Sequence, residues 1–193
     1  MKFDDVIKER KSVRSFKSKK VSWKDILEAI DCANQAPFAS NLNNLKYLII
    51  EDQDKIEKIA ELADQLWINE AQILVVAVSD EKKITNMHPD IGARYSAQQS
   101  GAAIENFLLK ITDLGLSSCW VGSFDEKEIK RLLKISPSMT IEALLPVGYE
   151  KGDTARKKKA ALENTIYWEE WDKTRREDLF KEPRERYSMD KSN

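Results

Sequence analysis

Positively charged side chains gather in the first part of the chain, where Arg10, Lys11 and Arg14 stand beside the hydroxyl of Ser12. Arg10, Ser12 and Arg14 alternate, so an extended segment would point all three side chains to one side. Guanidinium groups and a hydroxyl suit a phosphate, and the basic run 156–159 could complete such a pocket. A solvated surface is the commoner explanation of a basic cluster, and composition alone leaves both interpretations open.

Few other residues favour nucleophilic, acid–base or metal chemistry. Cys32 and Cys119 are not spaced as a Cys-x-x-Cys pair, and we expect reduced thiols that serve packing. A Ser-His or Cys-His mechanism, or a zinc site, would depend on the single histidine, His88, whose polar surroundings are typical of a turn that leads into a helix. The six glycines form neither a dinucleotide-binding fingerprint nor a phosphate loop. We therefore expect no metal site.

Composition bounds the class of protein. The chain has 193 residues and a mass of 22.2 kDa, with 41% hydrophobic and 34% charged residues and a formal net charge of -1. That balance provides no global field to attract nucleic acid or anionic lipid. The apolar run 73–78 is far shorter than a membrane span, and residues 1–5 lack the apolar segment of a signal peptide. We expect a cytoplasmic protein with no nucleic-acid or membrane partner.

The elements that must position these residues alternate between helical and strand-like patterns, which is typical of an α/β-like or α+β fold. Ser22 is a candidate N-cap, and Asp125 with Glu128 resembles a capping pair. Helices are predicted near 3–7, from 23 to a point before Pro37, near 54–66, at about 91–114, and from the capping pair at Asp125 and Glu128 through 133. Strands are predicted at 47–50, 73–78, 118–121 and 141–149, with 73–78 central.

Two segments suggest contact with a second subunit. The predicted helix 91–114 carries small residues at 101–103 and apolar residues on several sides, which favours burial all round at a subunit interface. After Lys151 the chain becomes highly charged, yet it contains Tyr167, Trp168 and Trp171. An arm lying on a partner would explain these aromatic residues, and a frayed tail with a few surface rings would explain them equally well.

Four blocks carry a resemblance to a known family. The stretch 9–16, Glu-Arg-Lys-Ser-Val-Arg-Ser-Phe, resembles the opening Arg-x-Ser-x-Arg-x-Phe/Tyr motif of the FMN-dependent nitroreductase family. The stretches 36–44, 115–124 and 145–149 resemble the following blocks of that family, in the same order and at similar spacing. Together the blocks cover most of residues 3–160, and their succession makes a flavoprotein the leading hypothesis.

The resemblance implies an α+β fold: a nitroreductase-like three-layer sandwich with a central, mostly antiparallel sheet flanked by helices. It also implies a homodimer that holds two FMN molecules at the subunit interface. Residues 1–163 would form the FMN-binding domain. Residues 164–193 would be an exchanged C-terminal arm of the same domain, packed on the partner subunit.

The resemblance also implies roles for particular positions, which differ in the part of the flavin they approach. The phosphate, the ribityl chain and the pyrimidine side would be held by Arg10, Lys11, Ser12 and Arg14, helped by Arg156 and Lys158. Pro37, Phe38 and Ala39 would approach the flavin from the other subunit. The isoalloxazine would be passed by Trp120, Val121, Gly122 and Ser123, with a backbone N–H near Gly122 donating to flavin N5. Ser40 and Asn41 would lie near the substrate face.

In a flavoprotein of this family the cofactor carries out the redox chemistry, so the resemblance requires no catalytic side chain. NADH or NADPH would reduce FMN, leave, and be replaced by a small-molecule electron acceptor such as a nitroaromatic compound or a quinone, in ping-pong turnover. Lys11 or Arg14 is the expected source of the positive charge that stabilises the anionic reduced flavin. A non-catalytic flavin-binding homodimer, used for sensing or cofactor storage, is the alternative. A specialised chemistry such as reductive dehalogenation is another, although nothing between 61 and 90 is long enough to indicate a lid.

The second block departs from the family pattern. Phe38, Asn43 and Asn44 stand where Ser, Gln and Pro are common. An aromatic wall at Phe38 would narrow the pocket in place of a polar contact, which would alter substrate preference. In the third block, Cys119 and Trp120 are residues whose types are more often found packed in a core than in redox or stacking roles.

Overall fold

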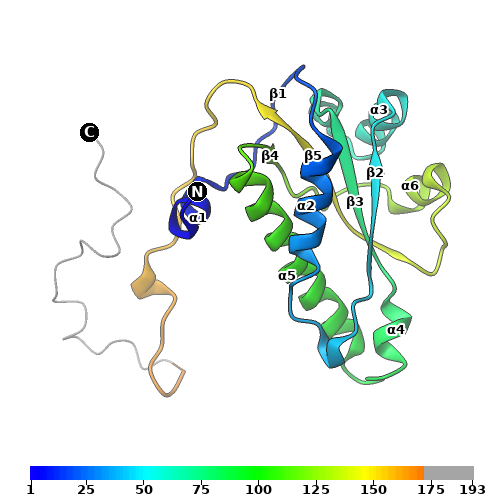
Figure 1. Ribbon diagram of the computed structural model, residues 1–193. Coiled ribbons are helices and arrows are strands. Elements are labelled where there is room, and N and C mark those ends of the chain that lie inside the picture. Colours follow the sequence, from blue (N-terminus) through cyan, green and yellow to red (C-terminus); the bar gives the residue numbers. More distant parts are fainter. Residues whose placement is uncertain (172–193) are drawn as a thin grey trace. The chain divides into compact units, whose positions relative to one another are not determined.

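An antiparallel sheet of five strands organises the computed structural model, which describes residues 1–171 (Figure 1). The chain divides into two units, Met1–Thr154 and a second unit that begins at Ala155. The strands of the first unit run in the order β1 (Phe16–Lys17), β5 (Thr140–Glu150), β3 (Ile73–Ser79) and β2 (Leu45–Ile50), and β4 (Ser117–Ser118) also pairs with β5. All of these pairings are antiparallel, as the family resemblance implied.

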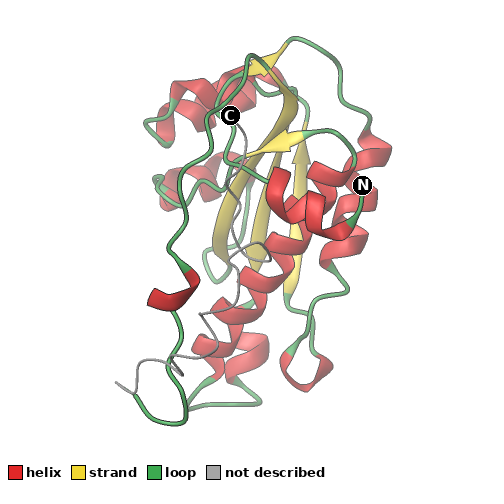
Figure 2. Ribbon diagram, turned by 90° about the vertical axis from the view of Figure 1, so that its left-hand side faces the viewer, coloured by secondary structure: helices red, strands yellow, loops and turns green. Residues whose placement is uncertain are grey.

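Helices cover both faces of the sheet (Figures 1 and 2). On one face lie α2 (Trp23–Ala33) and α5 (Gly92–Asp113), and on the other lie α3 (Gln53–Leu62) and α6 (Glu126–Leu133). Strand β3 is buried at every position, and its alternate residues serve the two layers: Val75 packs with α2 and α5, whereas Val76 packs with α3 and α6. The predicted central strand and the three-layer α+β architecture are therefore confirmed.

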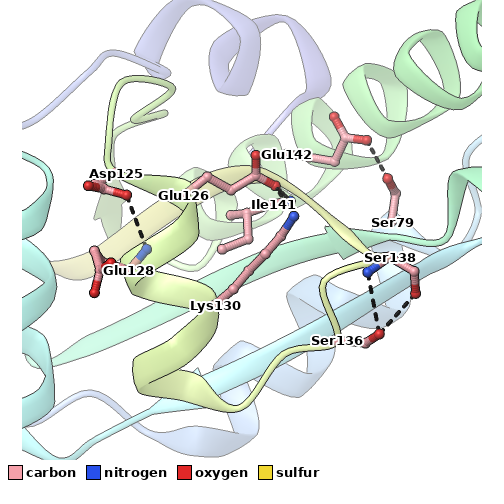
Figure 3. Close-up of polar contacts among 9 residues, drawn as sticks. All are labelled: Ser79, Asp125, Glu126, Glu128, Lys130, Ser136, Ser138, Ile141 and Glu142. Atoms are coloured by element: carbon pink, nitrogen blue, oxygen red, sulfur yellow. Dashed lines mark hydrogen bonds and ion pairs between the residues drawn. The ribbon is translucent and has the colours of Figure 1, made fainter.

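Side-chain caps fix where several helices begin. The Ser22 hydroxyl accepts a hydrogen bond from the backbone N–H of Lys24, and the Asp125 carboxylate accepts one from that of Glu128. Both caps confirm the sequence prediction. Figure 3 shows how α6 is then tied to β5: the Glu126 carboxylate accepts from the backbone N–H of Ile141 and pairs with Lys130.

The helix predicted at 54–66 ends earlier than expected. It stops at Leu62 because Asp64 adopts a left-handed backbone conformation, with φ of 51°. A left-handed residue just after a helix cannot continue it, and aspartate is one of the few residues other than glycine that tolerate this conformation. A short 3-10 helix, η2 (Leu66–Glu70), follows and leads the chain back to β3.

The strand predicted at 118–121 is also shorter than expected. Only Ser117 and Ser118 pair with β5, and Val121 rejoins it through an isolated bridge to Leu144. The backbone N–H of Leu144 donates to the carbonyl of Val121. In the same register, position 146 lies opposite Cys119, and an N–H at that position would face Cys119. Proline has no N–H to donate, which interrupts the ladder at Cys119 and Trp120.

The expectation that α5 is buried all round is wrong for the first half of the helix. Ile104, Phe107 and Ile111 are buried inside this single chain, so its apolar residues need no partner subunit. Toward the amino end, by contrast, Ala93 and Ala97 are exposed. The subunit interface proposed for this helix therefore stays a prediction, now limited to its exposed face.

The second unit contains one short 3-10 helix, η3 (Leu162–Asn164), within the described residues. The rings of Tyr167 and Trp171 lie 4.6 Å apart between centroids. Residues 172–193, the greater part of the expected C-terminal arm, lie outside the described residues. None of the helices within residues 1–171 combines the length and the hydropathy that crossing a bilayer requires.

Candidate functional site

The first and third sequence blocks lie side by side in the fold. The backbone N–H of Val13 donates to the carbonyl of Ser118 at 3.0 Å, and Ser12 forms a parallel bridge with Ser118. The extended segment 10–14 therefore runs along β4. In the chain, β4 is followed directly by the loop that contains Trp120 and Gly122. The two stretches are about a hundred positions apart in the sequence, and only the folded sheet brings them together.

The cations of the first block differ in their partners. Arg10 Nε lies 3.4 Å from the Glu105 carboxylate of α5, a loose ion pair. Lys11 Nζ lies 3.1 Å from both Glu150 and Asp153. Burial opposes the charge on Lys11, but the hydrogen bonds to both carboxylates more than offset it, so the pKa of Lys11 is raised. The charge of Lys11 is thus largely balanced within the chain.

Arg14 has no carboxylate partner among the described residues. Its exposed guanidinium lies 5.8 Å from the centre of the Trp67 ring. The segment just after it is firmly fixed, because the Glu70 carboxylate accepts hydrogen bonds from the backbone N–H of Phe16 and the hydroxyl of Ser15. These two bonds lower the pKa of Glu70. Arg14 is therefore a solvent-facing cation on a well-anchored backbone.

Cys119 lies beneath the same cluster. It is buried in the core under α3 and α6, and burial raises the pKa of its thiol, while Arg14, Ser12 and Arg10 oppose that rise. The prediction of a packing thiol is confirmed for this residue. The Ser12 side chain is thus a hydrogen-bond partner of the thiol, and the two guanidinium groups act on it through their charge.

Two polar groups at this point lack partners within residues 1–171. The Ser118 hydroxyl is buried without a hydrogen bond, which is a costly state for a polar atom. The backbone N–H of the exposed residue Gly122 donates to no backbone carbonyl within this range, and a Cβ there would meet only the Trp120 side chain, at 3.8 Å. Guanidinium groups, hydroxyls, a free N–H and an exposed indole together suit a ligand that has a phosphate, a polar chain and an aromatic ring.

The second block forms a strained loop. Pro37 is exposed, Phe38 is half-buried against the core under α2 and α5, and residues 39–41 form the 3-10 turn η1 (Ala39–Asn41). Within η1, Ser40 and Asn41 have φ values of 52° and 54°, the left-handed region that non-glycine residues rarely adopt.

A buried polar network holds this loop on α5. The Gln99 side chain accepts from the backbone N–H of Ala39 at 3.0 Å and donates to the carbonyl of Leu42 and to the side chain of Asn44. Asn44 in turn donates to the hydroxyl of Ser96 at 2.8 Å. Gln99, Asn44 and Ser96 are all buried, so the loop is positioned by satisfied polar groups rather than by apolar packing alone.

Hydrogen bonds account for two of the three departures from the family pattern. Asn44 is the buried link between the loop and α5. The Asn43 side chain accepts from the backbone N–H of Leu45 at 2.8 Å and donates to Asn34 at 3.0 Å, which orients the start of β2. Both residues therefore have structural roles in this chain.

His88 lies in the turn between α4 and α5, as the sequence predicted, but its contact with Ser40 was not foreseen. Its Nε2 lies 2.9 Å from the hydroxyl of Ser40, and its ring meets the Tyr95 ring edge-on, with centroids 5.4 Å apart. Ser40 and His88 are 48 positions apart, and no local motif joins them. The only available signal was that His88 is the one histidine in the sequence.

Within the first unit, the predicted site residues do not all lie together. The η1 loop lies at the α4 (Glu81–Thr85) end of the first unit, whereas β4 lies at the other end of α5 (Figure 1). Arg156 and Lys158 belong to the second unit. Two surface hollows contain none of the predicted residues; they are lined by Lys58, Glu61, Leu62, Glu128, Arg131 and Leu132, and by Ser18, Lys20, Val21, Glu51, Gln72 and Ile73.

Comparison with known proteins identifies the family. The model described as Nitroreductase family matches residues 7–87 and 62–149, which is well over half of the chain, and the chain therefore belongs to the nitroreductase family. This confirms the resemblance carried by the four sequence blocks. Membership supports an oxidoreductase.

Individual relatives agree with this assignment. The chain is 27% identical over 161 residues to a protein of Thermotoga neapolitana named Iodotyrosine deiodinase, covering 75% of this chain and 87% of that protein. A nitroreductase family protein from Clostridium novyi NT is 27% identical, with a TM-score of 0.72 and coverage of 90% of this chain and 97% of that one. A BluB-like flavoprotein from Clostridium difficile 630 is 25% identical, with a TM-score of 0.76 and coverage of 87% and 99%.

Proposed function

We propose that this protein is an FMN-dependent oxidoreductase that takes electrons from NADH or NADPH and passes them to nitroaromatic, quinone or related acceptors in ping-pong turnover. The observation that carries the proposal is the junction of the first and third blocks at Ser12 and Ser118. It gathers two guanidinium groups, a buried hydroxyl without a partner and a free backbone N–H. Each is a donor that a phosphorylated flavin could satisfy.

The residues divide into three roles. Arg10, Ser12 and Arg14 would hold the phosphate, the ribityl chain and the pyrimidine side of FMN. Lys11 would contribute less charge than the others, because Glu150 and Asp153 already balance it. Trp120, Val121, Gly122 and Ser123 would line the isoalloxazine.

The chain's own contribution to catalysis would be electrostatic. A bound FMN supplies the hydride chemistry, accepting from the nicotinamide and giving to the acceptor. The Gly122 N–H would donate to flavin N5, and the exposed guanidinium of Arg14 would favour the anionic reduced state. The backbone beside each group is anchored, through the N–H of Val13 to Ser118 and the N–H of Val121 to Leu144, which limits the reorganisation needed as charge develops.

A homodimer would complete the site. Pro37, Phe38 and Ala39 lie far from β4 within one chain, so they would reach the flavin from the partner subunit. Ser40 and Asn41 would then stand at the substrate face. The buried network that fixes η1 supports this arrangement, because it holds an exposed loop in a strained conformation.

The test is an anaerobic visible spectrum of protein that has been reconstituted with FMN and dialysed. One equivalent of NADH, and separately of NADPH, is then added. Retained flavin bands that bleach support the proposal. Retained bands that neither nucleotide bleaches would favour a non-catalytic flavin-binding homodimer, and a colourless dialysed protein would refute flavin binding.

Reductive dehalogenation is a second candidate, because the Thermotoga relative carries the name Iodotyrosine deiodinase. Against it stands the segment between Glu61 and Asp90, which is occupied by η2, the buried strand β3 and α4 and leaves no long insertion for a lid. Adding iodotyrosine to the reduced protein distinguishes the two reactions. Release of iodide at a rate matching flavin reoxidation would favour dehalogenation.

A further inference from the structure

The contact between Ser40 and His88 has no role in the function proposed so far. Ser40 Oγ lies 2.9 Å from His88 Nε2, and the edge-on Tyr95 ring restricts the orientation of the imidazole. We propose that this pair delivers a proton to the electron acceptor: Ser40 contacts the acceptor oxygen, and His88 supplies the proton from behind. The inference rests on the proposed function, because it needs an acceptor at the substrate face.

The Ser40 hydroxyl is not needed to hold its own loop. The buried network described above fixes the neighbouring residues Ala39, Leu42 and Asn44, and it makes no use of the Ser40 side chain. The backbone of Ser40 is nevertheless held at φ 52°, where non-glycine residues are strained. Strain of this kind is typical of functional sites, and here it presents an exposed hydroxyl.

His88 is held just as firmly. Its backbone N–H donates to the carbonyl of Ile84 at 2.9 Å, and its own carbonyl accepts from the N–H of Gly92 at 2.7 Å. The corner between α4 and α5 is so tight that a Cβ at position 92 would lie 2.6 Å from Thr85 Cα. The imidazole therefore projects from a rigid corner toward a rigid loop.

Four side chains from α4, the turn after it and α5 lie around the ring or close to it in the sequence. Tyr95 of α5 touches the ring, and Lys83 of α4 donates its ammonium protons to a main-chain carbonyl before β2. Asp90 follows in the same turn, and Arg94 lies in the first turn of α5. Within residues 1–171, none of these charged groups forms an ion pair with His88.

The pair keeps its hydrogen bond in both protonation states. A neutral imidazole accepts from the hydroxyl through Nε2, and an imidazolium donates to the hydroxyl oxygen through the same atom. Proton delivery then needs no rearrangement: the Ser40 proton moves to the acceptor while the His88 Nε2 proton moves to Ser40 Oγ. The neutral imidazole afterwards takes a proton from water.

The atoms and electrons balance for a quinone. The quinone gains two electrons and one proton as a hydride from the reduced flavin, and it gains the second proton from the imidazolium through Ser40. The product is a hydroquinone, and the flavin is reoxidised. The inference therefore concerns acceptors that must be protonated on oxygen, such as quinones, and excludes acceptors that take electrons alone.

That distinction gives the experiment its internal control. FMN-loaded protein, reduced anaerobically with dithionite, is mixed in a stopped-flow instrument with benzoquinone or with ferricyanide, which takes an electron but no proton. Ser40→Ala and His88→Gln should slow flavin reoxidation by benzoquinone roughly 100-fold, the low end for general acid catalysis. Reoxidation by ferricyanide should stay unchanged.

Ser138→Ala is a matched control variant. The Ser138 hydroxyl is also exposed and forms a 2.9 Å hydrogen bond, to the hydroxyl of Ser136 in the loop between α6 and β5 (Figure 3). Its loss tests the effect of breaking an exposed serine contact away from the proposed site. Both rates should stay at the wild-type value in this variant.

A second readout does not depend on turnover. Because His88 is the only histidine of the native sequence, an untagged, FMN-loaded protein gives one set of imidazole NMR signals, whose pH titration reports this ring alone. The wild-type benzoquinone rate should fall as pH rises, with a midpoint equal to that of the NMR titration. In His88→Gln the same rate should no longer follow that titration.

The outcomes separate the two proposals. Three results would each reduce the pair to a loop contact and overturn this inference alone. In the Ser40→Ala and His88→Gln variants, these are equal slowing with benzoquinone and ferricyanide, or an unchanged rate with benzoquinone. In the wild-type protein, it is a kinetic midpoint that differs from the NMR midpoint. Failure of the wild-type protein to retain FMN overturns the proposed function, and this inference with it. Flavin that dithionite reduces but NADH and NADPH do not overturns the proposed donor and favours the non-catalytic alternative, whereas the comparison of benzoquinone with ferricyanide still tests the pair.

Discussion

Replacing Arg14 with alanine should separate flavin binding from folding stability. Arg14 is exposed, and its one contact with a ring or a charged group among the described residues is the cation–π contact with Trp67, at 5.8 Å. Such a contact at an exposed site stabilises a protein by at most about 1 kcal/mol. The free energy of unfolding of the apoprotein should therefore fall by less than about 1 kcal/mol in Arg14→Ala.

The effect on FMN should be much larger. A hydrogen bond to a charged group contributes roughly 1.5–3 kcal/mol, which corresponds to a Kd for FMN that rises by about 10- to 150-fold. Quenching of flavin fluorescence on titration with apoprotein measures this Kd, and urea unfolding of the same apoprotein measures stability. Both measurements should use moderate salt, because exposed charges are screened.

Lys46→Ala provides the control, since it also removes one exposed positive charge but lies on β2, away from β4. Its Kd for FMN should match that of the wild type. If Arg14→Ala binds FMN as tightly as Lys46→Ala, the assignment of the phosphate and pyrimidine side to the first block is wrong. If Arg14→Ala instead unfolds far more readily, the residue is structural and the binding argument loses its basis.

Three further substitutions test the framework around the site. Glu70→Gln should lower the melting temperature near pH 7, and the difference between variant and wild type should vanish in acid. The hydrogen bonds from Phe16 and Ser15 hold the pKa of Glu70 in the folded protein below 4.5. The stabilisation is therefore present above pH 4.5 and is lost as the pH falls through the pKa of the folded state. Gly92→Ala should cost about 1–3 kcal/mol in urea unfolding, because its Cβ would collide with the backbone of Thr85; unchanged stability would show that the corner can open. Asn44→Ala should cost about 2–3 kcal/mol because it strands buried partners, and a loss below about 0.5 kcal/mol would contradict the buried network.

The elements that could be predicted from sequence carry their signals locally. Ser22 and Asp125 cap helices through hydrogen bonds within three residues, and the aliphatic run of β3 is too apolar to lie anywhere but between two layers. The strand predicted at 118–121 was too long because a distant residue decided the outcome. Pro146 interrupts the pairing of Cys119, and this depends on which strand lies beside β5.

The candidate site shows the same division. The alternation of Arg10, Ser12 and Arg14 was readable because it needs only an extended backbone. The contact of Ser12 with Ser118 and that of Ser40 with His88 join residues far apart in the chain, so no spacing could indicate them. The blocks resembled those of a family whose fold brings them together, and this resemblance supplied what spacing alone could not.

The polar network under η1 gives an independent reason to assign that loop a function. Buried amides such as those of Asn44 and Gln99 add little net stability even when every hydrogen bond is made, and they become costly when one is lost. Apolar residues would fill the same space without that risk. What the amides add is directional: they fix Ala39 and its neighbours against α5, so Ser40 stays in a strained conformation with its hydroxyl exposed. A loop whose only task was to connect α2 to β2 would need neither the strain nor the network.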